Sequence, residues 1–439
     1  METVIIKIVQ LVLSLSILVI VHEFGHFLFS KLFKVRVEKF YLFFNPWFTV
    51  FKFKPKGSET EYGMGWLPLG GYVKISGMID ESMDREAMAE EPKPWEFRTK
   101  PAWQRLLIMV GGVLMNFLLA FFIYAMMVLT WGEEYLPIKN VKMGYTFNEL
   151  TLKAGFQNGD IPLTADGVEL GRMSGKTLMT IVDAKEITVL RDGEIVSIQL
   201  PANFNKILFE EEDNFIPRYP FVIGSVNGRS PAKKAGLEEG DSIVGVNEAT
   251  DLGIYEIQKL LAENKEKEIT LTLFRNGQEK SIAVTPDENG KLGVALVPFN
   301  KLYETVRTKY NFFTAFPAGV RIGVETIKTY LGQFKYIFTK EGAQSLGGFG
   351  TIANIFPGKW NWADFWNMTA FLSIILGVMN LLPIPALDGG HVMFLLYEVV
   401  SGRKPNEKFM EYAQIAGMLF LIALLIYANG NDIFRAFFK

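Results

Sequence analysis

The feature that most constrains this chain is a polar pentapeptide inside an apolar run. Residues 22–26 read His-Glu-Phe-Gly-His, preceded by an uncharged, largely apolar segment at residues 8–21 and followed by Phe-Leu-Phe at residues 27–29. Polar side chains within membrane hydrocarbon each cost a few kcal/mol, so they are rare there and usually functional. We therefore expect the polar residues of this pentapeptide to have a function.

The pentapeptide has the spacing of a metal site. His22 and His26 lie one turn apart on the same face of a helix, so both imidazoles can bind one tetrahedral zinc ion. Glu23 is then placed to act as general base toward a water molecule, as in metalloproteases with the H-E-x-x-H pattern. An incidental polar turn is the competing interpretation, and the apolar surroundings disfavour it.

Composition limits the other possibilities. The chain has 439 residues, of which 49% are apolar and 14% aromatic, and this indicates a membrane protein with sizeable polar modules. No Lys/Arg-rich tract with interleaved aromatic residues is present, so no nucleic-acid partner is expected. The chain contains three histidines and no cysteine, which excludes disulfides, thiolate catalysis and Cys-ligated zinc.

Apolar periodicity predicts four membrane-spanning helices. They cover residues 1–32, residues 105–132, residues 361–401 with a break, and residues 408–430. At 1.5 Å per residue, His22 lies roughly 21 to 27 Å along the first span, near its far leaflet. Basic residues in region 33–104 and in the loop near Arg403 place that side in the cytoplasm. The first span has no cleavage site and is expected to be retained.

Two regions between the spans predict β structure. Region 33–104 is expected to form a cytoplasmic, membrane-associated β region, in which residues 61–75 read as a hairpin of strands broken by glycine turns. This hairpin is either a small sheet on the membrane or an edge that pairs with an extended substrate.

The block from residue 133 to 300 contains an internal repeat. Residues 154–160 recur as 235–241, and residues 189–193 recur as 273–277 at nearly the same offset. This predicts tandem α+β domains at residues 133–210 and 211–300. The second copy resembles PDZ domains of bacterial proteases, whereas the first has Pro162 in a strand. Peptide binding and a spacer role both stay open. Residues 301–360 are expected to form amphipathic interfacial helices.

A second polar element interrupts the third span. Residues 383–391 read Pro-Ile-Pro-Ala-Leu-Asp-Gly-Gly-His, and nonhelical backbone at membrane depth often marks a binding site. Asp388 is the preferred third zinc ligand because an Asp-Gly-Gly turn can aim a carboxylate. The rival, His391, begins the resumed helix and can orient a neighbour. Asn116, in the second span, is expected to bond a neighbouring helix rather than a substrate.

Taken together, these motifs resemble the site-2 protease family of intramembrane zinc metalloproteases, specifically the bacterial regulator-of-sigma-E protease group. The resemblance rests on the pentapeptide, on Asn380-Leu-Leu-Pro-Ile-Pro-Ala-Leu-Asp388-Gly-Gly, on the segment around Asn116, on residues 67–74 and on the tandem repeat. It implies zinc bound by His22, His26 and Asp388, and Glu23 as general base. It also implies substrate binding by Asn380 and the hairpin, for which the candidates are Gly63, Gly65, Gly70, Gly71 and Tyr72.

The resemblance also implies an architecture and an activity. The fold would be a polytopic α-helical membrane protein with a β-hairpin or sheet and two extracytoplasmic PDZ-like domains, in the bacterial inner membrane, with its active site near the cytoplasmic leaflet. It would cleave membrane-spanning segments of single-pass proteins, such as anti-sigma factors or signal-peptide remnants, after an earlier trimming cleavage. Partners would be these substrates, the lipid bilayer and peptide ligands of the PDZ-like domains. The alternatives are a noncatalytic PDZ membrane scaffold and a zinc transporter.

Overall fold

The computed structural model describes residues 2–68, 70–78, 91–205, 214–337 and 347–438. The chain forms two compact units, one made of Met1–Gly132 and Lys309–Lys439 and the other of Glu133–Thr308. The predicted boundary between the repeats at residue 210, and residues 338–346 of the predicted interfacial segment, lie outside the described residues.

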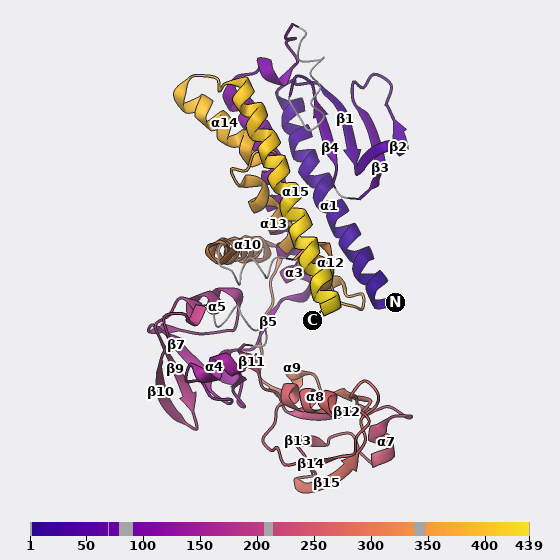
Figure 1. Cartoon of the computed structure of the whole chain (residues 1–439), viewed down its shortest axis with the longest axis vertical. Coiled ribbons are helices and arrows are strands. Elements are labelled where there is room, and N and C mark those ends of the chain that lie inside the picture. Colours follow the sequence, from indigo (N-terminus) through magenta and orange to yellow (C-terminus); the bar gives the residue numbers. More distant parts are fainter. Residues whose placement is uncertain (1, 69, 79–90, 206–213, 338–346, 439) are drawn as a thin grey trace. The chain divides into compact units, whose positions relative to one another are not determined.

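The first unit is dominated by helices (Figure 1). They are α1 (Glu2–Leu32), η1 (Phe97–Thr99), α3 (Ala102–Trp131), α10 (Phe312–Ile337), α12 (Phe349–Ile355), α13 (Trp362–Leu381), α14 (Asp388–Ser401) and α15 (Glu407–Phe438). Among the described residues, four helices are long and apolar enough to cross a membrane, namely Glu2–Leu32, Ala102–Trp131, Trp362–Leu381 and Lys408–Phe434. The predicted number of spans is confirmed.

Helix α3 is the centre of this unit, because it packs against α1, α10, α13 and α14. Ile108 and Met109 of α3 share a buried cluster with Val392 and Leu395 of α14. Further along α3, a second cluster of buried apolar side chains packs α3 against α13. Residues from the two ends of the chain are therefore held against one helix.

The break after α13 is shorter than the sequence suggests. Helix α14 begins at Asp388, so the prediction that the helix resumes at His391 is wrong. An acidic residue in the first turn suits the positive end of the helix. A Cβ atom on Gly389 would lie 2.0 Å from the Leu382 carbonyl oxygen, so the glycine lets the first turn of α14 lie directly on the chain that leaves α13.

A four-stranded sheet follows α1. Its strands are β1 (Val37–Leu42), β2 (Phe44–Phe53), β3 (Glu61–Leu67) and β4 (Tyr72–Ile75), in the order β2-β3-β1-β4. Strand β1 pairs in parallel with β3 and antiparallel with β4. The predicted hairpin is therefore wrong in its pairing, because β1 lies between the two strands it would have joined. Strand β4 is left at an edge of the sheet.

The second unit is built from short strands and helices. They are β5 (Glu133–Tyr135), η2 (Ile138–Asn140), β6 (Tyr145–Thr146), α4 (Glu149–Lys153), β7 (Ile161–Ala165), β8 (Val168–Glu169), α5 (Gly175–Val182), β9 (Glu186–Arg191), β10 (Glu194–Gln199), β11 (Ile216–Pro217), β12 (Phe221–Val226), α7 (Pro231–Ala235), β13 (Ser242–Val246), α8 (Ile254–Glu263), β14 (Ile269–Arg275), β15 (Gln278–Val284), β16 (Val294–Leu296), α9 (Phe299–Leu302) and β17 (Val306–Thr308). Its main sheets have the orders β10-β9-β7-β8 and β15-β14-β13-β12-β16, and two short pairs, β11-β6 and β17-β5, complete it.

The sequence repeat forms the same hydrogen-bonded cluster twice. Arg191 donates to both carboxylate oxygens of Asp160 at 2.8 and 2.7 Å, and Arg275 donates to both oxygens of Asp241 at 2.7 Å. In each copy this arginine, Arg191 or Arg275, also donates a hydrogen bond to a glycine carbonyl oxygen at 2.9 Å. Equivalent atoms make equivalent bonds, which supports the interpretation of two copies of one module.

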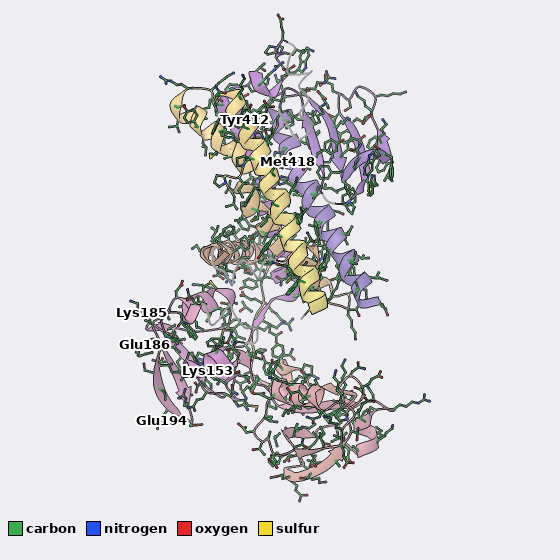
Figure 2. The ribbon with its side chains drawn as sticks, in the orientation of Figure 1. Lys153, Lys185, Glu186, Glu194, Tyr412 and Met418 are labelled. Atoms are coloured by element: carbon green, nitrogen blue, oxygen red, sulfur yellow. The ribbon has the colours of Figure 1, made fainter. Side chains whose placement is uncertain are left out.

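The surfaces of the two units differ in kind (Figure 2). Lys153, Lys185 and Glu194 present charges on the second unit, whereas Tyr412 and Met418 are exposed on α15 of the first. Exposed apolar side chains continue along α15, as expected for a helix that meets lipid rather than water. The second unit thus has the surface of a water-soluble module.

The Asp241–Arg275 pair predicts pH-dependent stability. Burial raises the pKa of the Asp241 carboxyl, but hydrogen bonds from Arg275 and the Glu238 amide outweigh burial and hold the pKa below its usual value. The carboxylate therefore stabilises the fold fully above about pH 4, the unfolded pKa, and loses this effect as pH falls through the lowered native pKa. Asp241→Asn should lower the opening free energy of β13 and β14 by about 3 kcal/mol at pH 7, and by less in acid.

Hydrogen exchange in the whole chain measures this difference. The matched control is Glu238→Gln, because Glu238 is the exposed second partner of Arg275 at 2.8 Å and should contribute less than about 1 kcal/mol. A difference between wild type and Asp241→Asn that stays constant from pH 7 to pH 3 would contradict the assignment.

Candidate metal centre

Helix α1 presents both histidines of the pentapeptide to α3. His22 and His26 are buried, and a Cβ atom on Gly25 would lie 2.2 Å from the Gly111 carbonyl oxygen of α3. The two backbones therefore touch at this glycine. The close approach brings the imidazoles within reach of polar groups on α3.

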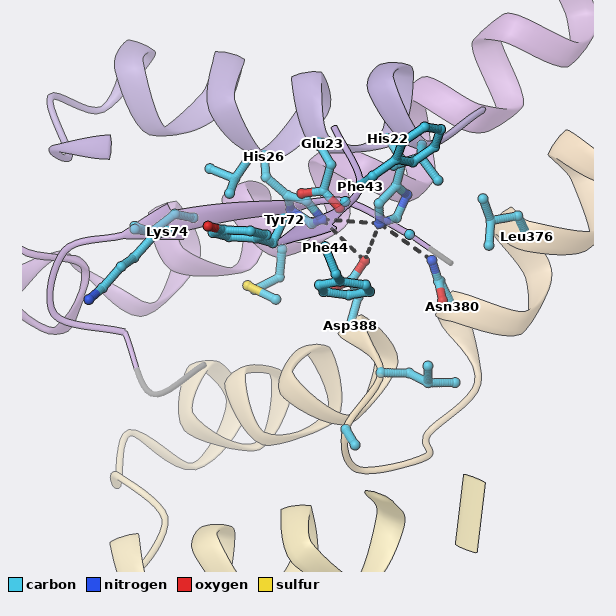
Figure 3. A pocket seen from close by; sticks show the side chains of 18 of the residues that line it. His22, Glu23, His26, Phe43, Phe44, Tyr72, Lys74, Leu376, Asn380 and Asp388 are labelled. Carbon is cyan, nitrogen blue, oxygen red and sulfur yellow. Dashed lines mark hydrogen bonds and ion pairs between the residues drawn. The ribbon is translucent and has the colours of Figure 1, made fainter. Parts of the chain in front are cut away.

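Three potential ligand atoms converge at this contact (Figure 3). His22 Nε2 and His26 Nε2 lie 3.3 Å apart, and Asp388 Oδ2 lies 3.1 Å from the first and 3.3 Å from the second. Atoms bound tetrahedrally to zinc at about 2.0–2.1 Å lie about 3.3 Å from one another. The triangle therefore has the dimensions of three corners of a zinc site.

The hydrogen bonding of this triangle also fits a metal. Asp388 Oδ2 is buried and accepts no hydrogen bond from any described residue, although both imidazoles are close. A buried carboxylate oxygen without a partner is costly unless a cation completes it. His26 Nδ1 lies 2.9 Å from the Ile108 carbonyl oxygen, to which it can donate only as N–H. In the neutral ring the lone pair is then on Nε2, facing the triangle.

The structure separates the two candidate third ligands. Asp388 stands in the first turn of α14 and joins the histidines in the His/Asp cluster found among the described residues. His391 lies one turn further on, with its Nε2 3.1 Å from Nε2 of Gln414. Ala386, just before Asp388, has a positive φ of 80°, a conformation uncommon outside glycine. The chain that aims Asp388 is thus locally strained.

A cavity of about 680 Å³ opens beside the three atoms. This volume lies within the usual range of about 300–1,000 Å³ for ligand sites. Its lining includes Glu23, Gly70, Gly71, Tyr72 and Asn380. Glu23 packs beside the start of β4, because a Cβ atom on Gly71 would lie 3.6 Å from Glu23 Cγ. The edge strand, the candidate base and the metal ligands therefore face one space.

Two of the predicted substrate-binding glycines are elsewhere. Gly63 and Gly65 lie in β3, which is paired on both sides. A Cβ atom on Gly63 would lie 2.5 Å from the Tyr41 ring, and one on Gly65 would lie 2.1 Å from the Phe44 carbonyl oxygen. Both glycines therefore pack closely inside the sheet, and neither is among the residues that line the cavity.

Two groups on α3 contribute more than the sequence suggested. The Ile108 carbonyl is a backbone group, so no residue type indicates it. The Asn116 amide, expected to bond a neighbouring helix, does so with a candidate metal ligand, since its Nδ2 lies 3.0 Å from His22 Nδ1. The sequence feature that could have indicated this role is a single asparagine in an apolar membrane span.

Comparison with known proteins agrees with this geometry. The family model described as peptidase family M50 matches residues 10–424. The chain belongs to peptidase family M50. The chain is also 29% identical to the regulator of sigma E protease of Haemophilus influenzae, over 97% of this chain and 98% of the relative. It is 28% identical to the regulator of sigma-E protease RseP of Escherichia coli, over 97% of each.

Membership of family M50 confirms two of the expectations drawn from the sequence. The resemblance to site-2 proteases is confirmed, and so is the expectation that the chain is a peptidase. The match covers α1, α13 and α14, which carry the converging ligand atoms.

Loss of the third corner of the triangle should abolish metal retention. Asp388→Ala leaves both imidazoles in place but removes the only carboxylate of the cluster among the described residues. Loss of a residue that only hydrogen-bonds to a ligand lowers metal affinity by up to about 100-fold. Loss of a ligand itself should therefore lower zinc affinity by more than about 100-fold. Competition with a chromophoric chelator measures this, with His391→Gln as the matched control. Equal losses in the two variants would contradict the assignment of Asp388.

Proposed function

We propose that this protein is a zinc-dependent endopeptidase of the bacterial inner membrane that cleaves single-pass membrane proteins within or beside their membrane-spanning segments. The observation that carries this proposal is the convergence of His22, His26 and Asp388 on one point between apolar helices, with Glu23 on the same cavity. Family M50 peptidases depend on zinc, and this donor set of two imidazoles and a carboxylate suits zinc.

His22, His26 and Asp388 would hold the ion through two imidazole nitrogens and one carboxylate oxygen. When bound, zinc supplies Lewis-acid chemistry that acidifies water and polarises a carbonyl group. Glu23 takes the proton of the attacking water and passes it to the leaving amine.

A helical substrate hides its carbonyl groups in intrahelical hydrogen bonds, so it must be extended before it is cleaved. Strand β4 is an edge strand on the cavity, and an extended segment can add to it through backbone hydrogen bonds. Gly70, Gly71 and Tyr72 lie where such a segment would enter. Asn380, whose Nδ2 is 3.4 Å from His22 Nε2, is placed to bond the extended backbone near the metal.

The membrane placement follows from charge. The β-sheet region is rich in lysine and faces the cytoplasm, which puts the metal site near the cytoplasmic leaflet and the second unit outside. The two repeated modules of that unit are PDZ-like. They exclude substrates that still carry bulky outer domains, so that cleavage follows an earlier trimming cleavage. Anti-sigma factors and signal-peptide remnants are the proposed substrates.

Neutralising the base should separate metal binding from catalysis. Glu23→Gln keeps the side-chain shape but cannot accept the water proton, so cleavage should fall by about 10²- to 10⁴-fold with zinc content unchanged. Mass spectrometry of membrane-protein fragments from cells measures cleavage, and elemental analysis measures zinc. The control is Glu59→Gln, since Glu59 is exposed in the same sheet region. Wild-type cleavage by zinc-loaded Glu23→Gln would refute the general-base role.

The edge strand can be displaced without touching a ligand. A Cβ atom at Gly71 would lie 2.6 Å from the Tyr41 carbonyl oxygen and 2.7 Å from Val19 Cγ1, so Gly71→Val must push β4 away from α1. A shift of about 1 Å can cost about 100-fold in rate. We expect that loss in fragment production, with zinc retained. Gly171→Val is the control, because no atom lies within 4 Å of its Cβ position. Undiminished cleavage in Gly71→Val would rule out strand addition at β4.

A further inference from the structure

Two amide side chains approach the two ring nitrogens of His22. Asn116 Nδ2 lies 3.0 Å from Nδ1, and Asn380 Nδ2 lies 3.4 Å from Nε2. A neutral imidazole has one N–H and one lone pair, so it cannot accept hydrogen bonds at both nitrogens. The two amides therefore cannot both donate a hydrogen bond to the ring.

Asn116 is the amide that faces Nδ1, whereas Nε2 is the ring nitrogen that lies against His26 and Asp388. The Asn116 side chain is fully buried, and its Oδ1 has no hydrogen-bond partner in the described part of the chain. A half-turn of the amide exchanges the oxygen and the nitrogen with almost no change of shape. The oxygen then lies against His22 Nδ1 and accepts a hydrogen bond from its N–H.

This hydrogen bond decides where the lone pair of His22 lies. With the proton on Nδ1, the lone pair is on Nε2, which faces His26 Nε2 at 3.3 Å and Asp388 Oδ2 at 3.1 Å. We propose that Asn116 is a positioning residue for the metal ligand His22, whose tautomer and ring orientation it fixes through its amide oxygen. The inference rests on the proposed zinc site and deepens it.

The neighbouring ligand shows the same arrangement with a different acceptor. His26 Nδ1 lies 2.9 Å from the Ile108 carbonyl oxygen, a backbone group that cannot turn over. Helix α3 therefore supplies an acceptor to each histidine, one from its backbone and one from a side chain. Such partners of ligating histidines fix the tautomer and raise the basicity of the ligand.

The backbone of Asn116 is hydrogen-bonded to a neighbouring helix. Ser373 of α13 donates a hydrogen bond to the Asn116 backbone carbonyl at 2.8 Å. This contact fixes α3 beside the helix that carries Asn380. A side chain attached here can hold an imidazole in one orientation, which a mobile segment could not do.

Zinc affinity of the full-length protein tests the role. Asn116→Leu keeps the volume but offers no acceptor, so affinity should fall by about 10- to 100-fold in chelator competition. Asn116→Asp keeps an acceptor oxygen and should lose less than about 10-fold, the lower limit of that range. Ser373→Ala removes one hydrogen bond of an interface that is also held by buried apolar side chains of α3 and α13, and it should bind zinc as the wild type does.

Each of the opposite results would overturn the inference. Wild-type affinity in Asn116→Leu would show that no acceptor is needed. If Asn116→Asp lost as much zinc affinity as Asn116→Leu, the acceptor oxygen at residue 116 would be irrelevant. A loss in Ser373→Ala as large as in Asn116→Leu would reduce the effect to helix packing. If the wild type itself binds no zinc, the proposed function fails instead, so the two failures are distinguishable.

A spectroscopic measurement on the wild-type protein tests the proposal without relying on any variant to fold. The chain has three histidines, so ¹⁵N-histidine labelling gives a simple spectrum. In zinc-loaded wild type, His22 should carry its proton on Nδ1 in a hydrogen-bonded state, as His26 does. In Asn116→Leu the His22 Nδ1–H signal should shift and that of His26 should not. Protonation of zinc-loaded wild-type His22 on Nε2 would refute the proposal.

Discussion

The need to satisfy polar side chains between apolar helices governs the centre of this molecule. His22, His26 and Asp388 are withdrawn from water, and a polar group so placed must find a partner. Helix α3 provides for the imidazoles through Ile108 and Asn116, while Asp388 Oδ2 is left for a cation. The packing of α3 against α1, α13 and α14 is thus the condition on which the chemistry depends.

The parts of the site that could be predicted are those in which residue type conflicts with surroundings. A pentapeptide with two histidines and a glutamate in an apolar run has no inexpensive structural use, and neither has Asp388 between prolines and glycines. These conflicts single out the candidate ligands without any knowledge of the fold. They also favoured Asp388 over His391, which the structure places against Gln414.

Features that depend on pairing between distant segments could not be read in the same way. Residues 61–67 and 72–75 have the composition of strands, but nothing local shows that β1 inserts between them. The glycines at 63 and 65 suggest turns because their packing partners, Tyr41 and Phe44, are supplied by other strands. Likewise, Gly389 and Gly390 suggested a continued break, whereas they allow α14 to start at Asp388 on top of the preceding chain.

The placement of the ligands along the chain has a consequence for synthesis. Two of them lie on the first helix and the third on α14, after both repeated modules have been made. A growing chain therefore carries an incomplete set of donors until translation is almost finished. Asp388 must also dock through α14 against α3 before the set closes. The candidate metal site of this peptidase therefore closes only late in synthesis, and hydrolysis at that site has to wait until α14 is in place.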